Sequence, residues 1–361
     1  MAYTTIDDPS AYFHTQLYTG DGNATQAITN DANAGDFQPD WLWIKRRSDS
    51  EHHMVADSNR GAGKRLRSND TDAEDDNGVT SFNTDGFTTL SSAVWNASSE
   101  TYVAWQWKAN GGTTASNSNG GVTSTVQANT TAGFSIVTWT GDGSDETVGH
   151  GLSSAPELFI IKNREDSTNW RIGQDIVTGK KMTDGNGYYM ELDDTKASTN
   201  PGSAVTWGST PTAPTSSVFT VGSNNAHNGS SDDFVAYCFH SVQGYSKIGT
   251  YTGNGNADGP FVYTGFKPAW VLIKRTDSSA EWHMWDNKRE DYNGNPNDTA
   301  LRANNNNAES DSTDYSIDFL SNGFKVRNAS NLDNASSSTQ IYMAFAEHPF
   351  VSSEGVPCTA R

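Results

Sequence analysis

Acidic side chains in glycine-rich turns are the first residues of this sequence that could do chemistry. Asp21, Asp142 and Asp145 lie within such turns, and carboxylate oxygens are the ligands that Ca²⁺ prefers in proteins. An EF-hand loop, however, ends in a distant bidentate glutamate, and that spacing is absent here. Asp-Gly pairs also form tight turns without any metal. We therefore predict no metal ligands and no cofactor, and keep calcium in one acidic loop as the alternative.

No arrangement of residues in the sequence matches a known catalytic mechanism. A glycosidase needs two carboxylates at a set separation on one concave face, but the acidic runs at 72–76 and 232–233 have the polar surroundings of solvated loops. Gly-x-Ser-x-Gly, Walker and His-Glu-x-x-His motifs are absent. His52 and His53 are adjacent, so in a strand they would point to opposite faces. We predict that the protein has no catalytic residues and is not an enzyme.

Tryptophan supplies the best candidates for binding. The chain has 11 Trp, of which six fall in the repeated strands described below. Exposed aromatic rings stack on sugars and anchor protein interfaces, so the remaining five are the candidate binding-surface aromatics. They are Trp95, Trp170, Trp207, Trp282 and Trp285. The alternative is that they pack beneath long loops.

The charge of the chain excludes some partners. Lys and Arg number 24 and Asp and Glu number 43, which gives a net charge of −19. A field of that sign repels nucleic-acid phosphates and anionic membrane surfaces. No apolar run approaches the roughly 18 residues of a spanning helix, and the N-terminus lacks a signal-peptide pattern. We expect neither nucleic-acid binding nor membrane insertion.

Two smaller features have local interpretations. The basic cluster at residues 64–67 could hold an acidic partner subunit, or it could neutralise the acidic run at 70–76. The two cysteines, Cys238 and Cys358, are too few for a disulfide framework. Cys238 falls in an apolar strand and is expected to be a small buried residue.

Three motifs recur three times in the same order. The first is an aromatic residue followed by Thr-Gly-Asp/Asn-Gly, which predicts a strand that ends in a tight turn; it occupies residues 18–22, 139–143 and 251–255. The second is Pro, one residue, four apolar residues and Lys, which predicts a strand buried on both faces; it ends at Lys45, Lys162 and Lys274. The third is a closing strand whose aromatic residues bracket a small residue, and we expect that residue to be buried at equivalent places; it is Ala104, Ala236 or Ala344.

These motifs predict an all-β fold of three tandem antiparallel β-sandwich repeats. Each copy shows several short strands separated by turn residues, and no stretch carries helical periodicity with caps. The predicted domains are a first repeat at 1–110, a second at 122–243, and a third at 244–361 that includes a C-terminal tail. Residues 111–121 are rich in Asn, Gly, Ser and Thr, which is typical of a flexible linker.

Taken together, the motifs resemble repeat domains in structural proteins of marine tailed bacteriophages, and the resemblance covers nearly the whole chain. It rests on residues 37–46 with Arg60-Gly61, 131–137 with 148–152, 251–255 with 317–324, and 342–350. The resemblance implies jelly-roll or concanavalin-like sandwiches in tail-fibre, head-fibre or capsid-decoration proteins. It implies a location in the virion and supplies no catalytic residues, and the net charge of −19, which keeps the chain away from the packaged genome, places it at the virion surface.

The sequence therefore predicts a virion structural protein, an exposed fibre, appendage or capsid decoration component that acts by binding. Phage proteins combine an extracellular type of composition with the lack of an export signal, because lysis releases them. The expected partners are other virion proteins, further copies of the chain in a homo-oligomer, with a trimer as the expected symmetry, and a host-surface glycan. A lectin-like glycan-binding module is the alternative function. A polysaccharide depolymerase is a further alternative, which the sequence favours least.

Overall fold

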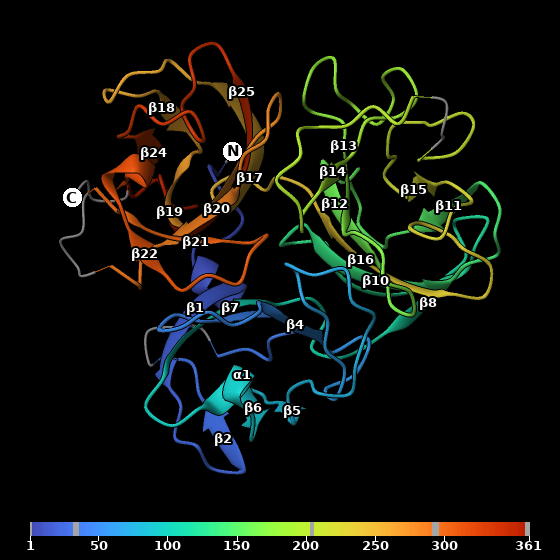
Figure 1. Ribbon diagram of the computed structural model, residues 1–361, viewed down its shortest axis with the longest axis horizontal. Helices are drawn as coiled ribbons and strands as arrows, with labels where there is room; N and C mark the ends of the chain where they lie inside the picture. The colour runs from blue at the N-terminus through green and yellow to red at the C-terminus, as the bar shows by residue number, and fades with distance from the viewer. Residues whose placement is uncertain (1, 32–35, 203–205, 291–295, 358–361) are drawn as a thin grey trace.

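A computed structural model of the chain describes residues 2–31, 36–202, 206–290 and 296–357. These residues form an all-β, sandwich-like fold of several antiparallel sheets, none of which is closed. Figure 1 shows three lobes around a common centre, coloured blue to cyan, green to yellow, and orange to red. The single α-helix of the described residues, α1 (Ala93–Asn96), has four residues. No helix in this part of the chain has the length and apolar character needed to cross a membrane.

The strands follow one another lobe by lobe. The first lobe contains β1 (Phe13–Thr19), β2 (Thr25–Ile28), β3 (Trp41–Arg46), β4 (Met54–Asp57), β5 (Ser81–Phe82), β6 (Phe87–Leu90) and β7 (Thr101–Trp107). The second contains β8 (Ala115–Asn117), β9 (Ser124–Asn129), β10 (Phe134–Thr140), β11 (Glu146–Gly149), β12 (Leu158–Asn163), β13 (Arg171–Gln174), β14 (Met190–Glu191), β15 (Val218–Val221) and β16 (Asp233–Phe239). The third contains β17 (Ser246–Thr252), β18 (Phe261–Tyr263), β19 (Phe266–Arg275), β20 (Trp282–Asp286), β21 (Thr299–Arg302), β22 (Ser310–Asp311), β23 (Ile317–Leu320), β24 (Gly323–Val326) and β25 (Thr339–Pro349).

The same order of four strands recurs in the large sheet of each lobe. The orders are β1-β7-β3-β4, β10-β16-β12-β13 and β17-β25-β19-β20. The second sheet continues to β14 at one edge and through β9 to β8 at the other, and the third continues through β21 to β22. Each lobe also has a small sheet, with the orders β2-β6-β5, β11-β15 and β18-β24-β23. The three recurring motifs of the sequence therefore occupy matching strands.

The Pro-apolar-Lys strands are buried on both faces, as predicted. In β3, Trp41 and Trp43 face a central core that all three lobes share. Leu42 and Ile44 point the other way, into a separate core beneath the small sheet of the first lobe. Strands β12 and β19 alternate in the same manner between the central core and the outer core of their own lobe. Successive side chains of a strand point to opposite faces, so four apolar residues in a row are what two cores require.

The Thr-Gly-Asp/Asn-Gly turns are fixed by a hydrogen-bonded asparagine. The backbone N–H of Asp21 donates to Oδ1 of Asn96, 2.8 Å away, and the N–H of Asn254 donates to Oδ1 of Asn334 at the same distance. A side chain on Gly20 would collide with the carbonyl oxygen of Ala97, and the same conflict exists at the corresponding glycines of the other two lobes. The motif is therefore a structural clamp between the opening strand and the turn before the closing strand.

The closing strand of the third lobe is displaced by two residues from the expected alignment. Ala104 lies opposite Ile44 and Ala236 lies opposite Ile161, but the equivalent position opposite Ile273 holds Tyr342. Ala344 is buried, as predicted, yet it sits two residues farther along. The tyrosine fits because its other neighbour is Gly249, where a side chain would collide with the tyrosine ring.

The segment predicted to be a flexible linker, 111–121, is held against the second lobe. The carboxylate of Asp40 accepts the backbone N–H groups of Ala109, Gly111 and Gly112 at 2.7–2.8 Å. Strand β8 within the segment pairs with β9. A polar sequence without large apolar residues is ordered here because a buried carboxylate and a neighbouring strand satisfy its backbone.

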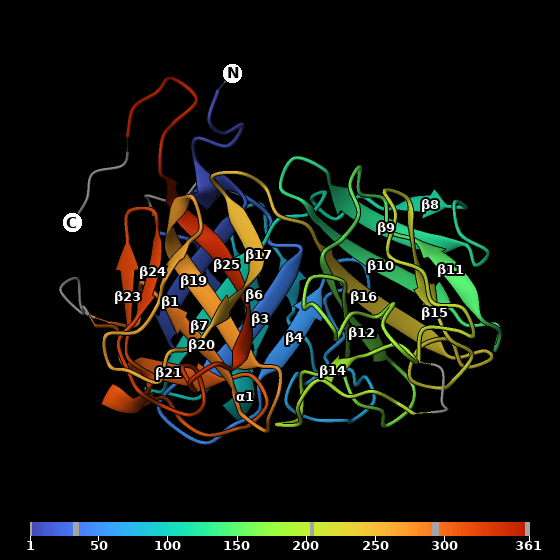
Figure 2. The ribbon, with the colours of Figure 1, turned by 90° about the horizontal axis from the view of Figure 1, so that it is seen from above.

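The first and last described segments of the chain lie on the same side of the molecule (Figure 2), where the backbone N–H of Ser353 donates to Asp7. Ile6 of the N-terminal segment packs into the central core. Cys238 is a buried free cysteine in the outer core of the second lobe, as predicted, whereas Cys358 lies outside the described residues.

Overpacking at Ala236 provides a test of this arrangement. Ala236 is fully buried between Val137 and Ile161 of the neighbouring strands, so Ala236→Leu should lower the free energy of unfolding by about 1–3 kcal/mol. The matched control is Ala27→Leu on β2, where the alanine is exposed, and it should change stability little. Urea unfolding of both variants measures the difference, and equal stability of Ala236→Leu and the wild type would contradict the packing.

Candidate functional site

The three lobes are closed into a ring by one backbone contact that recurs at each boundary between lobes. We call these boundaries the first–second, second–third and third–first seams. The N–H of Glu74 donates to the carbonyl of Arg164, the N–H of Ser198 to Thr276, and the N–H of Glu309 to Arg47, at 2.7–3.0 Å. Each lobe thus extends a loop onto the strand end of the next lobe, and the third lobe returns to the first.

A ring N–H accompanies this contact at two seams. The indole of Trp170 in the second lobe donates to the carbonyl of Arg67 in the first, at 2.7 Å. The indole of Trp282 in the third lobe donates to the carbonyl of Glu191 in the second, at 2.8 Å. At the third–first seam His53 takes the place of the indole, beside the backbone of Arg302.

The buried lysines that end the second motif lie beside these contacts between lobes. Lys162 donates to the carbonyl of Thr71 across the first–second seam at 3.1 Å, and Lys274 donates to that of Thr195 across the second–third seam at 2.8 Å. Lys45 instead donates to the carbonyl of Asp49 within its own lobe. Burial lowers the pKa of each lysine to about 8. The recurring lysine of the second motif therefore binds backbone at the rim of the sheet.

Two of the seams also carry a buried chain of charges. At the first–second seam, Glu74 accepts from Arg60 of its own lobe at 2.7 Å and from Arg164 of the next lobe at 2.8 and 3.0 Å. Arg60 in turn pairs with Asp57, and Tyr237 donates its hydroxyl hydrogen to the same aspartate. Burial alone would raise the pKa of Glu74, but the hydrogen bond from Arg164 and the charge of Arg60 outweigh it and lower the pKa below its ordinary value.

The third–first seam has the same arrangement of charges, and the second–third seam has neutral side chains at the corresponding positions. At the third–first seam Glu309 lies between Arg289 and Arg47, and Asp286 binds Arg289 and the indole of Trp105. At the second–third seam the corresponding positions hold neutral residues. These are Gln174, Val177, Ser198, Thr276 and Met343.

The interpretation of the five tryptophans as an exposed binding surface is wrong, because each is at most 1% exposed. Trp170 and Trp282 do serve interfaces, but these are the seams inside the chain. Trp95, Trp207 and Trp285 fill the outer cores of the first, second and third lobes. The indole of Trp95 donates to the carbonyl of Asn77 and that of Trp207 to the carbonyl of Tyr188, and both acceptors lie in segments between strands. Strand periodicity alone does not reveal these contacts.

The other candidate residues have local partners. The carboxylate of Asp21 accepts from Asn23 and Asn96, that of Asp142 from Ser144 and Asn228, and that of Asp145 from Ser209 and Ser223. In the basic cluster, Lys64, Arg65 and Arg67 all pair with the acidic run that follows it. That run is neutralised locally, which was one of the two interpretations of the cluster.

One group of carboxylates among the described residues could hold a cation. Ligand oxygens of Glu290, Asp298 and Asp311 lie within 4.8 Å of one another. Glu290 and Asp311 both accept hydrogen bonds from Thr299, so the strand geometry of the third lobe accounts for the group.

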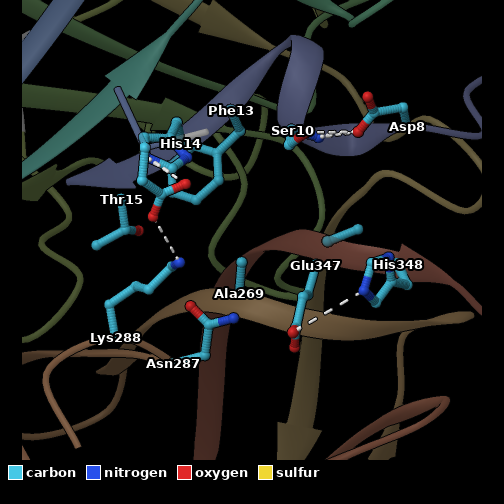
Figure 3. Close-up of a pocket in the computed structure, with 12 residues that line it drawn as sticks. Asp8, Ser10, Phe13, His14, Thr15, Ala269, Asn287, Lys288, Glu347 and His348 are labelled. Carbon is cyan, nitrogen blue, oxygen red and sulfur yellow. Dashed lines mark hydrogen bonds and ion pairs between the residues drawn. The ribbon is translucent and has the colours of Figure 1, made fainter. Parts of the chain in front are cut away.

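A cavity of about 260 Å³ opens at the third–first seam. Figure 3 shows that one wall comes from the first lobe, with His14 and Thr15 on β1, and the other from the third lobe, with Ala269, Asn287 and Lys288. An ion pair of 3.0 Å between Lys288 and Asp31 bridges the two walls.

Two small side chains create this cavity. Thr15 of β1 occupies the position that Ile136 and Ile248 hold in the other lobes, where those isoleucines belong to the central core. Ala269 follows Pro268 at the position where the other lobes have an acidic residue, Asp40 or Glu157. The sequence contains both differences, but they become visible only once the strands are aligned by their registers.

Comparison with protein families assigns the whole ring to one group. Residues 8–349 match the model of a family described as a domain of unknown function, DUF7483. The chain belongs to this family. The DUF7483 match spans all three lobes and both charged seams. No curated protein matches the chain.

Removing the charge of Glu74 tests the contribution of the first–second seam. Glu74→Gln should lower the free energy of unfolding by about 2–3 kcal/mol at neutral pH, because buried arginines lose a charged acceptor. The folded-state pKa of Glu74 lies below its ordinary value. Its stabilising contribution is therefore complete at neutral pH and is lost as the pH falls through that folded-state value.

The control for this variant lies at the equivalent position of the neutral seam. Ser198→Ala removes a hydroxyl group but no charge, and its effect on the free energy of unfolding should be smaller and independent of pH. Urea midpoints measured at neutral and acid pH compare the two variants. A Glu74→Gln variant that keeps the wild-type midpoint at neutral pH would show that the charge chain does not stabilise the ring.

Proposed function

We propose that the chain is a structural protein on the virion surface of a tailed phage, where it acts by binding in assembly and in attachment to the host. The observation that carries the proposal is the closed ring. The central strands of its large sheets are buried on both faces, so a rigid centre supports long polar loops that point outward. Loops on a rigid scaffold suit recognition, because they vary without disturbing the core.

We also propose a more specific fold for the lobes. Each lobe is a concanavalin-like or jelly-roll sandwich, and the three sandwiches are tandem repeats with the boundaries predicted from the sequence. The recurring strand order and the core between each large sheet and its small sheet support this description.

The charge of the chain supports an outer position on the particle. At −19 the protein is repelled by packaged nucleic acid. The buried arginines of the seams are already neutralised inside the ring, so they do not offset the acidic surface.

Association with further copies of the chain has a candidate surface in the third lobe. Phe261 and Tyr263 of β18 are 46% and 54% exposed, and β18 is an edge strand of its small sheet. The corresponding strand of the first lobe, β2, has no aromatic residue. Exposed aromatic side chains on an edge strand favour a protein interface.

A lectin-like function is the second candidate, and the cavity at the third–first seam favours it. Its walls combine hydroxyl, amide and carboxylate groups with the methyl groups of Ala269 and Ala346. Such a combination is typical of sites for small polar ligands.

Particle labelling tests the proposed location. Antibodies raised against the purified ring should decorate intact phage particles in electron micrographs, and cryo-electron microscopy should place three-lobed density at the labelled position. The control is the same label on particles of an unrelated phage. Absence of the chain from purified particles, or its detection only after the particles are opened, would overturn the proposal.

Substitution on β18 tests the oligomer. Phe261→Ser combined with Tyr263→Ser should convert the homo-oligomer to monomers, because the variant loses the exposed aromatic contact and keeps the cores. Light scattering after size exclusion measures the mass, and circular dichroism confirms that the fold is kept. A wild-type chain that is already monomeric at micromolar concentration, or a variant of unchanged mass, would contradict this interface.

A further inference from the structure

The cavity at the third–first seam lies where the other two seams are filled. At the first–second seam, Asp40 fills the corresponding position and binds Ser58 and the backbone of the segment that leads to the second lobe. At the second–third seam, Glu157 accepts the backbone N–H of Ser241 in the connecting segment. The third–first seam has Ala269 at this position, a side chain with no polar group to bind a neighbouring segment.

The cavity also contains buried polar atoms without a partner. Thr15 is 3% exposed, and its hydroxyl has no hydrogen-bond partner among the described residues. The same holds for Oδ1 of Asn287 on the opposite wall. An unpaired buried polar group costs about 1–3 kcal/mol, so a ligand that supplies the missing hydrogen bonds would be stabilised here. In the other lobes the position of Thr15 is apolar and carries no such cost.

The charges of the lining decide between classes of ligand. The Lys288 ammonium is paired with Asp31, and the Glu347 carboxylate is paired with Lys267 at 2.7 Å. Burial lowers the pKa of His14, which keeps its imidazole neutral at neutral pH. Among the described residues that line the cavity, no cation is therefore left to bind an anionic ligand, and the net charge of the chain disfavours such a ligand. A neutral ligand with several hydroxyl groups matches the free donor and acceptor positions.

The volume of the cavity and the apolar part of its lining restrict the class of ligand further. A cavity of about 260 Å³ is near the lower limit of roughly 300 Å³ for sites that hold drug-sized ligands. The methyl groups of Ala269 and Ala346 provide apolar surface beside the polar groups. One pyranose ring offers hydroxyl groups at its rim and C–H groups on its faces.

We propose that the cavity at the third–first seam binds a single neutral sugar residue, at the end of a glycan, through Thr15 and Asn287. This inference rests on the proposed function in binding and names the ligand of that function. At the first–second seam the equivalent space is filled by Asp40 and the connecting segment that it binds. At the second–third seam it is filled by Glu157 and the connecting segment there. The sugar takes this place at the third–first seam.

Two substitutions fill the cavity with the residues that the other lobes use. Thr15→Ile introduces the residue found at positions 136 and 248, and Ala269→Glu introduces the residue found at position 157, so both variants should fold. Matched controls are Thr25→Ile and Ala27→Glu, which make the same changes at exposed positions of β2.

The probes are galactose, glucose, mannose and N-acetylglucosamine, tested one at a time by saturation-transfer NMR and calorimetry. We expect at least one of them to bind the wild type and both controls, with affinity at least about tenfold lower in Thr15→Ile and Ala269→Glu, a loss of about 1.4 kcal/mol. The inference is overturned if no neutral sugar binds, if binding is equal in all variants, or if N-acetylneuraminic acid binds better than the neutral sugars. Particle labelling is independent of these results, so a chain found on the virion that binds no sugar overturns only this inference.

Discussion

Burial of each large sheet on both of its faces is the constraint on which this structure depends. The outer face is covered within its own lobe, but the inner face bears large aromatic residues such as Trp41, Trp105 and Trp270. One lobe alone would expose those rings to water, and two lobes would leave one side of the central core open. Only a closed ring of three lobes removes the whole aromatic core from solvent, which explains why the same backbone contact is made at all three seams.

The seams are alike in their backbone contacts and differ in their side chains. Charged chains built on Glu74 and Glu309 occupy two seams, and neutral residues hold the corresponding positions of the third. Buried ion pairs add little net stability compared with well-packed apolar groups, but they penalise a wrong partner strongly. The differences therefore favour one order of lobes around the ring, because a charged loop placed at the neutral seam would lack its arginine.

Local sequence patterns predicted the strands well and their surroundings poorly. The run from Trp41 to Lys45 specified a strand buried on both faces, and the Thr-Gly-Asp/Asn-Gly motif specified its turn, because each depends on neighbouring residues. The seams could not be predicted, since backbone carbonyls far apart in the chain make their contacts. Trp170 and Trp282 were misplaced for that reason, and the alignment at Ala344 was wrong by two residues because a glycine on the next strand accommodates Tyr342.

Three copies of one design within a chain allow each position to be judged against two others. Where all copies agree, as at the buried lysines and the turn glycines, the fold explains the residue. Where one lobe has a different residue and a neighbour compensates for it, as Gly249 does for Tyr342, packing explains the difference. Thr15 and Ala269 depart together, toward smaller side chains, and leave a cavity with an unpaired hydroxyl. Packing alone favours isoleucine at the first of these positions, so the cost of the cavity indicates that something other than the fold selects these two residues.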